Sequence, residues 1–173
     1  MRIEWEGKTL ITTQFHFLTW PDYSIPNDPK TFLQLLQAVN EQRLHLERND
    51  SPILVHCRSL FPSSLPSFLL LQSLGAFFGS GQRLRDGNGD HNSAGIGRTG
   101  TFCLVHTALR CLNAACEMGH LPPISLLDVL RQLRKQRSGM VTHRAQYLFC
   151  YEALLSEATR IQKQLLRQQN GCS

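Results

Sequence analysis

The feature that most constrains the fold is a glycine-rich segment that opens directly into a helical pattern. Residues 93–100 read SAGIGRTG, and residues 99–118 carry apolar side chains at helical spacing up to Gly119. Glycines let the backbone curl so that successive N–H groups point inward, and a helix N-terminus adds positive potential, so the segment suits an anion. It is not a Walker A loop, because no Gly-Lys-Ser/Thr follows. Taken alone, it would also suit an ordinary glycine-rich turn.

A second segment, far upstream, supplies a candidate nucleophile. Residues 53–57 read ILVHC, which predicts a buried strand that ends in His56 and Cys57. Joined end to end, the two segments give VHCSAGIGRTG, which resembles the signature loop of the protein tyrosine phosphatases. The resemblance implies that Cys57 is a thiolate nucleophile and that Arg98 clamps the phosphate through a bidentate fork. It also implies a phosphate cradle with supporting residues: Ser93, Ala94, Gly95, Ile96, Gly97 and Arg98 form the cradle, His56 orients it, and Thr99 hydrogen-bonds the sulfur.

The tripeptide Trp20-Pro21-Asp22 is similar to the acid loop of the same family. The resemblance implies that Asp22 protonates the leaving tyrosine oxygen and then acts as a base toward water. Trp20 would be the hinge of a closing lid. So short a string would also suit an ordinary turn, but its place 35 residues before the His-Cys strand end favours the acid loop.

A third segment, residues 134–149, resembles the loop that positions water in this family. Gln146 and Tyr147 match the family pattern, whereas Thr142 stands where a glutamine is usual and His143 where a threonine is usual. Gln146 is therefore our candidate for contacting the phosphate and positioning the water. Because threonine is shorter than glutamine, we expect the phospho-enzyme to be hydrolysed more slowly than it forms.

Residues 58–92 stand between the two halves of the signature loop. They are rich in Ser, Leu, Gly and Phe, and no strand or helix period runs through them. Two interpretations stay open, a retained intron read in frame or a genuine, disordered insertion. With this insert, 40 residues separate Cys57 from Arg98, where the family has five, so we expect the chain to be catalytically impaired. The alternative function is a catalytically dead module that binds phosphotyrosine or another anion.

The expected fold class is α/β. The resemblance implies a twisted mixed sheet flanked by helices, of which this chain would hold the C-terminal half and would be incomplete at the N-terminus. Residues 1–165 would form a partial catalytic domain interrupted by residues 58–92, and residues 166–173 a frayed tail. The sequence predicts strands at about 9–18 and 52–57, and helices at 29–47, 99–118, 125–136 and 144–168.

Charge and composition narrow the classes of partner. The net charge of +5 suits a phosphate-directed site, and the basic run 131–144 would either guide acidic phosphopeptides or form a solvated helix face. We expect phosphotyrosine-containing proteins as partners and no nucleic acid, because basic and aromatic residues are not interleaved. No segment predicts a membrane span. The sequence carries no sign of the oligomeric state.

The six cysteines show no disulfide framework and no metal-binding spacing. Cys103 and His106 would share one helix, either as a ligand pair or, as we expect, as core residues. The implied chemistry needs neither a metal nor a cofactor. A thiolate nucleophile needs a reducing setting and no signal peptide is found, so we expect a cytoplasmic location.

Overall fold

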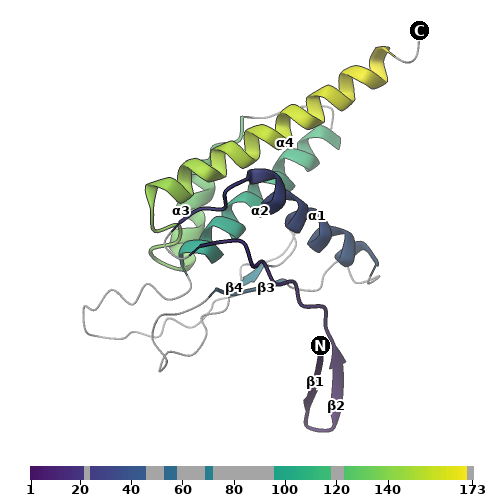
Figure 1. Cartoon of the computed structure of the whole chain (residues 1–173), viewed down its shortest axis with the longest axis vertical. Helices are drawn as coiled ribbons and strands as arrows, with labels where there is room; N and C mark the ends of the chain where they lie inside the picture. The colour runs from purple at the N-terminus through teal and green to yellow at the C-terminus, as the bar shows by residue number, and fades with distance from the viewer. Residues whose placement is uncertain (22–23, 46–52, 58–68, 72–95, 118–122, 171–173) are drawn as a thin grey trace.

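The structure, a computed structural model, describes residues 1–21, 24–45, 53–57, 69–71, 96–117 and 123–170. Within them, the chain forms β1 (Arg2–Trp5), β2 (Lys8–Ile11), α1 (Pro29–His45), β3 (Ile53–Val55), β4 (Leu69–Leu71), α2 (Gly97–Glu117), α3 (Leu126–Gln136) and α4 (Arg144–Asn170). The helices gather together, β3 and β4 lie beside them, and the β1–β2 hairpin projects away (Figure 1).

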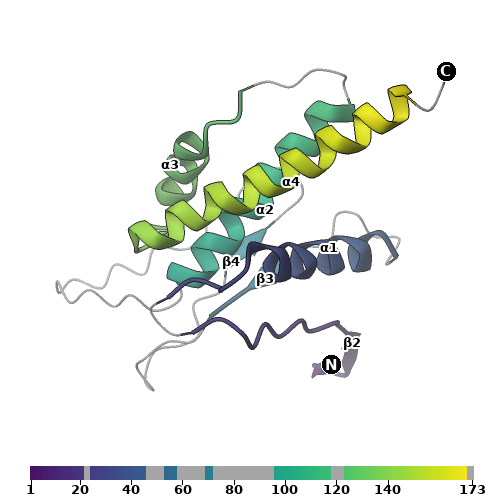
Figure 2. The same ribbon diagram turned by 45° about the horizontal axis from the view of Figure 1, so that its top comes forward.

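Helix α2 lies at the centre of the fold. It packs against α3 and α4 and contacts β3, while α1 packs against α4 (Figure 2). Residues 99–106 are all buried, so the first turns of α2 are covered on every side. The helix predicted over 99–118 is confirmed, and it begins two residues earlier than expected, at Gly97.

Phe32 of α1 joins the N-terminal segment to the helical core. Its side chain is fully buried, and its ring centroid lies 5.5 Å from that of Trp20, 5.4 Å from that of Phe149 and 6.3 Å from that of Phe102. These contacts are edge-to-face, the arrangement that aligns the positive edge of one ring with the negative face of another. The cluster fixes Trp20 against the helices that carry the rest of the candidate site.

The N-terminal strand is shorter than predicted. Strands β1 and β2 form an antiparallel hairpin whose turn places Glu6 and Gly7 at positive φ, 47° and 73°. The paired register ends where Arg2 faces Ile11, and among the described residues no strand is available to pair with residues 12–20. The predicted strand over 9–18 is therefore wrong beyond Ile11.

Strand β3 confirms the strand expected before His56 and Cys57, and its partner comes from the insert. Strand β4 runs antiparallel to β3, with Ile53 opposite Leu71 and Val55 opposite Leu69. An unpaired strand edge offers a row of backbone donors and acceptors. The backbone of a short leucine run can pair with them, and this pairing needs no alternation of apolar and polar side chains. Residues 58–68 and 72–92, the rest of the insert, lie outside the described residues.

The predicted helices at 29–47, 125–136 and 144–168 are confirmed, with small changes at their ends. Ser125 caps α3, because its side chain accepts a hydrogen bond from the Asp128 N–H at 3.2 Å. Helix α4 continues to Asn170, although a frayed tail was expected from residue 166. Its last turns consist mainly of Gln, Lys, Leu and Arg, which lose little side-chain freedom in a helix.

The strands of the described residues form two separate antiparallel pairs. The mixed twisted sheet expected from the resemblance therefore stays a prediction. None of the helices that the structure describes is long and apolar enough to cross a bilayer.

His106 links α1 to α2 inside the core. It is buried, its Nε2 lies 3.1 Å from Asn40 Oδ1, and its ring stacks on that of Phe102. Burial lowers the pKa of His106 from 6.5 to about 4, and the positive charges of Arg110 and Arg43 lower it further in the same direction. His106 is thus a neutral core residue at physiological pH, as expected for this part of the helix.

We predict that His106 makes the fold sensitive to acid. The unfolded chain binds a proton at this side chain below about pH 6.5, whereas the folded chain does so only near pH 4. Its contribution is therefore fully present above pH 6.5 and is lost as the pH falls toward 4, by up to about 3 kcal/mol. Denaturant titrations between pH 4 and 7 should show a smaller loss of stability in His106→Gln. The exposed His45→Gln is the matched control, and an unchanged slope in His106→Gln would contradict the prediction.

Candidate functional site

The backbone at the start of α2 is joined to the loop that precedes α4. The Ile96 carbonyl accepts two hydrogen bonds at 3.1 Å each, one from the Gly100 N–H and one from the Val141 N–H. The first bond closes the opening turn of the helix, and the second ties that turn to a segment 45 positions later. The end of the glycine-rich segment is therefore held by residues from the other end of the chain.

Two glycines permit this close approach. A Cβ atom at Gly100 would lie 2.5 Å from the Val141 nitrogen, which is closer than real Cβ contacts allow, and 3.2 Å from the Met140 carbonyl carbon. A Cβ atom at Gly97 would lie 3.0 Å from Thr142 Oγ1 and 3.1 Å from Gln146 Nε2. Gly100 therefore admits the backbone of the neighbouring loop, and Gly97 admits its side chains.

Gln146 lies beside the phosphate cradle predicted from the sequence. Its side chain is buried, and its Oε1 accepts hydrogen bonds from Thr142 Oγ1 at 3.2 Å and from the His143 N–H at 3.4 Å. The second bond resembles half of a capping box, in which a residue in the first turn reaches back to the start of its helix. These bonds hold Oε1, and both amide atoms lie close to Gly97: a Cβ atom there would be 3.1 Å from Nε2 and 3.4 Å from Oε1.

Trp20 and Arg98 bring the acid-loop segment to the same helix end. Arg98 Nη1 donates to the Trp20 carbonyl at 3.5 Å. Trp20 Nε1 in turn donates to the Ser24 carbonyl at 2.8 Å, and the Ser24 N–H donates to the Pro21 carbonyl at 3.4 Å. Asp22, the predicted general acid, lies outside the described residues.

Cys57 lies just beyond the end of β3 and is half-buried. Burial raises the pKa of the nearby Cys103 thiol and lowers that of Arg137, and a negative charge on Cys57 would raise both pKa values. In both neighbours burial is the larger cause of the shift. Cys57 is therefore near α2, and the two residues that its charge would affect are Cys103 in the core and Arg137 at the end of α3. His56, beside it, is exposed.

The Thr99 hydroxyl is an exception to the rule that buried polar atoms are paired. Thr99 is 1% exposed, and its Oγ1 has no hydrogen-bond partner among the described residues. The sequence predicts that this hydroxyl hydrogen-bonds the sulfur of Cys57, and with the insert present that bond is not formed. An unpaired buried hydroxyl costs about 1–3 kcal/mol, so it marks a place where a partner is missing.

The structure thus brings together one group of the predicted site residues: Trp20, Ile96, Gly97, Arg98 and Gln146. It leaves Cys57 and Thr99 without the hydrogen bond expected between them. Ser93, Ala94, Gly95 and Asp22 lie outside the described residues.

Sequence reasoning missed the role of Arg134. The basic run that contains it suggested a solvated face or a steering patch, yet Arg134 donates to the Met140 and Val141 carbonyls at 2.9 and 3.0 Å. One sequence signal pointed to a tight loop after this helix: Gly139 follows the predicted helix end, and in the structure it has φ +76°. Cys103 and His106 are core residues, and the described part of the chain holds no group of three side chains suited to a metal ion.

Comparison with known proteins gives one family match. A family model described as protein-tyrosine phosphatase matches residues 2–59 and 90–156. The match stops at residue 59 and resumes at residue 90, so residues 60–89 have no counterpart in the family model.

Three relatives illustrate the range of similarity. The chain is 27% identical over 146 residues to the human tyrosine-protein phosphatase non-receptor type 23, which covers 84% of this chain and 6% of the relative. Two Drosophila melanogaster proteins are each 32% identical to this chain. The tyrosine-protein phosphatase non-receptor type 61F matches over 142 residues, 82% of this chain and 18% of the relative. The tyrosine-protein phosphatase corkscrew matches over 143 residues, 81% of this chain and 12% of the relative. The chain therefore spans only a small part of these proteins.

We predict that the two glycines of the helix start respond differently to alanine. Gly100→Ala places a methyl group against backbone, which must shift, so the free energy of unfolding should fall by about 2 kcal/mol. Gly97→Ala meets only the ends of the Thr142 and Gln146 side chains, which can rotate, so the change should stay within about 1 kcal/mol. Urea denaturation of both variants tests this. Equal losses in the two variants would contradict the packing described above.

Proposed function

Because this chain belongs to the protein-tyrosine phosphatase family, we propose that it carries the catalytic loops of an enzyme that hydrolyses phosphotyrosine on proteins. The observation that carries the proposal is that Arg98, which contacts Trp20, follows directly after Gly97, which lies beside Gln146, at the N-terminal end of α2. A helix N-terminus with a guanidinium and an amide close to it suits a phosphate dianion. We further propose that the enzyme is the form in which Cys57 is joined directly to Ser93.

In the first chemical step of the proposed reaction, the Cys57 thiolate attacks phosphorus. The bond from phosphorus to the tyrosine oxygen breaks, and Asp22 gives its proton to that oxygen, so that neutral tyrosine leaves. Arg98 and the N–H groups of the cradle stabilise the charge that develops on the phosphoryl oxygens. The products are a phosphocysteine and an ionised Asp22.

In the second step, water attacks the phosphocysteine and Asp22 takes a proton from it. The bond between sulfur and phosphorus breaks, which releases phosphate and restores the thiolate. Gln146 is proposed to position this water through its amide group, which lies beside Gly97. Thr142 hydrogen-bonds Gln146 instead of reaching the water as a glutamine would. The steps require no metal or cofactor, and the thiolate favours a reducing compartment such as the cytoplasm.

With residues 58–92 present, we propose that the chain has little or no phosphatase activity. Strand β4 runs antiparallel to β3, so the chain that leaves Cys57 returns along its own strand. An active loop instead requires the chain to pass from the cysteine into α2 within a few residues. The unpaired Thr99 hydroxyl supports the same view, since its expected partner is the nucleophile.

A second candidate function is anion binding without catalysis. It is favoured by the contacts of Ile96, Gly97 and Gln146, which form although the insert is present. A chain with this half of the site would bind phosphate while lacking a correctly placed thiolate. Phosphate binding without turnover distinguishes this function from an enzyme.

The origin of the insert decides which function applies in the cell. We propose that residues 58–92 are a retained intron, and the gap of the family match at residues 60–89 supports an added segment. Amplification of the transcript across the codons of Val55 and Thr101 tests this directly. A product shorter by the 35 codons of residues 58–92 is expected. If only the long product is found, the insert is a genuine part of the protein and the anion-binding function is favoured.

We predict that deletion of residues 58–92 creates phosphatase activity. The shortened chain should hydrolyse a phosphotyrosine peptide, and the 173-residue chain should not. Cys57→Ser should abolish the activity, and Asp22→Asn should lower it by a factor of about 10² to 10⁴ by removing the general acid. Arg98→Lys, which keeps the charge but loses the fork, serves as a graded control. Turnover by the full chain that depends on Cys57 would refute the proposed impairment.

We predict that Thr142 makes the second step slow in the shortened chain. Rapid mixing with a chromogenic aryl phosphate should show a burst equal to one turnover, followed by a slower steady state. Thr142→Gln should raise the steady-state rate and leave the burst rate unchanged, because the longer amide reaches the hydrolytic water. His143→Thr, the neighbouring departure from the family pattern, is the matched control. A reaction without a burst in the parent chain would show that the first step limits the rate.

A further inference from the structure

We propose that Arg134 is a positioning residue of the phosphate site. Its guanidinium on α3 holds the Met140 and Val141 carbonyls, and this keeps Thr142 and Gln146 against the start of α2. The proposal rests on the proposed function, because the site that Arg134 positions is the phosphate site described above. It assigns a specific task to a residue in a run of positive charge that otherwise suggests steering or solvation.

The guanidinium makes two directed contacts with the loop. Nε donates to the Met140 carbonyl at 2.9 Å, and Nη2 donates to the Val141 carbonyl at 3.0 Å. Both distances are typical of good hydrogen bonds, and bonds from a charged donor are stronger than neutral ones. A rigid planar fork suits two adjacent carbonyls, whereas a lysine ammonium lacks that fork.

The backbone that Arg134 holds is in a conformation that needs support. Val141 has φ +61°, in the left-handed region that a β-branched residue strongly disfavours. Such a residue keeps this conformation only where its surroundings fix it. Three features fix Val141 here: Arg134 donates a hydrogen bond to its carbonyl, its N–H donates to the Ile96 carbonyl, and its side chain is buried.

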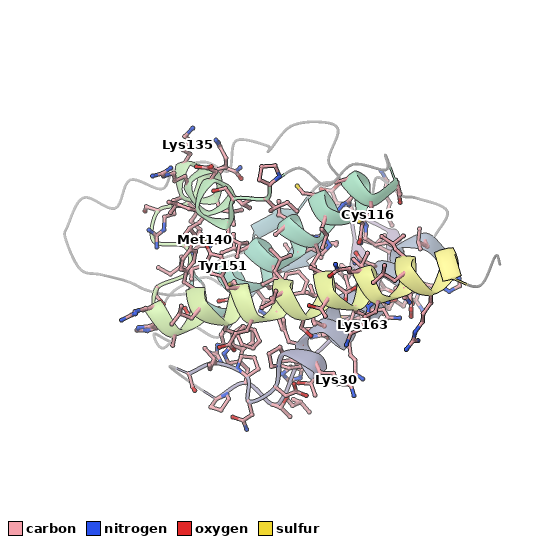
Figure 3. The ribbon with its side chains drawn as sticks, turned by 90° about the horizontal axis from the view of Figure 1, so that it is seen from above. Lys30, Cys116, Lys135, Met140, Tyr151 and Lys163 are labelled. Carbon is pink, nitrogen blue, oxygen red and sulfur yellow. The ribbon has the colours of Figure 1, made fainter. Side chains whose placement is uncertain are left out.

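The strained residue stands directly beside the site. Its N–H reaches the Ile96 carbonyl at the start of α2, and the next residue, Thr142, hydrogen-bonds Gln146. The Met140 side chain is fully buried beside α3, whereas Lys135 of the same helix points away from the core (Figure 3). A relaxed Val141 would withdraw Thr142 and Gln146 from Gly97, so Arg134 acts on the site through the loop.

Amide hydrogen exchange of the full 173-residue chain tests the contact without any requirement for activity. Arg134→Met should speed exchange of the Val141 amide about tenfold or more, because loss of the charged hydrogen bonds frees the loop. The amides of Leu104 and Val105, in the buried middle of α2, are the internal control. Arg131→Met is the matched variant, since Arg131 pairs with Asp128 on the exposed side of the same helix. Arg134→Lys should recover part of the Val141 protection.

Two results would overturn the proposal. One is unchanged exchange at Val141 in Arg134→Met. The other is equal acceleration at Val141, Leu104 and Val105 with a matching fall in the unfolding midpoint, which would show a purely structural role.

Kinetics of the chain lacking residues 58–92 give a second readout. Arg134→Met should slow steady-state turnover about tenfold with KM nearly unchanged, and Arg134→Lys should recover part of the rate. Equal turnover in Arg134→Met and its parent would also overturn the proposal. If the shortened parent shows no turnover, the proposed function fails while the exchange data still decide the role of Arg134.

Discussion

The contact between the start of α2 and the loop before α4 is the constraint on which the candidate site depends. Backbone meets backbone there, with the Ile96 carbonyl bound to the Val141 N–H at 3.1 Å and no room for a side chain at Gly100. This approach sets where Gln146 lies relative to Gly97. The buried first turns of α2 then pack against α3 and α4, so the helical core and the site share one set of contacts.

The insert separates Cys57, the proposed nucleophile, from the contacts at the start of α2, and those contacts form although the insert is present. Ile96, Gly97 and Gly100 contact residues after position 95, and Arg98 donates a hydrogen bond to the Trp20 carbonyl. None of these contacts involves the Cys57 end of the loop. The insert therefore changes how Cys57 is connected to α2, while Ile96, Gly97 and Gly100 contact the loop before α4. This arrangement is compatible with both proposed functions, since the contacts at the start of α2 do not depend on where Cys57 lies.

Local signals in the sequence predicted the helices well, because their causes are local. Pro29 suits a first helical turn, and Ser125 accepts the hydrogen bond expected of a cap. The role of Arg134 and the positive φ of Val141 could not be predicted, since each depends on residues brought together only by tertiary packing. Strand β4 was missed for a related reason, because backbone pairing with β3 needs no side-chain period. Resemblance to the family identified the residues of the candidate site, whereas the distances between them are known only from the folded structure.

Energetic arguments favour the same connection between Cys57 and Ser93 that the chemistry requires. The buried Thr99 hydroxyl lacks a partner, which costs about 1–3 kcal/mol, and a sulfur brought back to the loop would supply one. Holding the ends of a 40-residue connection together, in place of a five-residue one, costs about 2 kcal/mol more in chain entropy. The β3–β4 pairing recovers part of this cost through its backbone hydrogen bonds, but it returns the chain along β3 instead of passing it directly into α2. The interrupted loop is therefore unfavourable for stability, which agrees with the proposal that the insert also impairs catalysis.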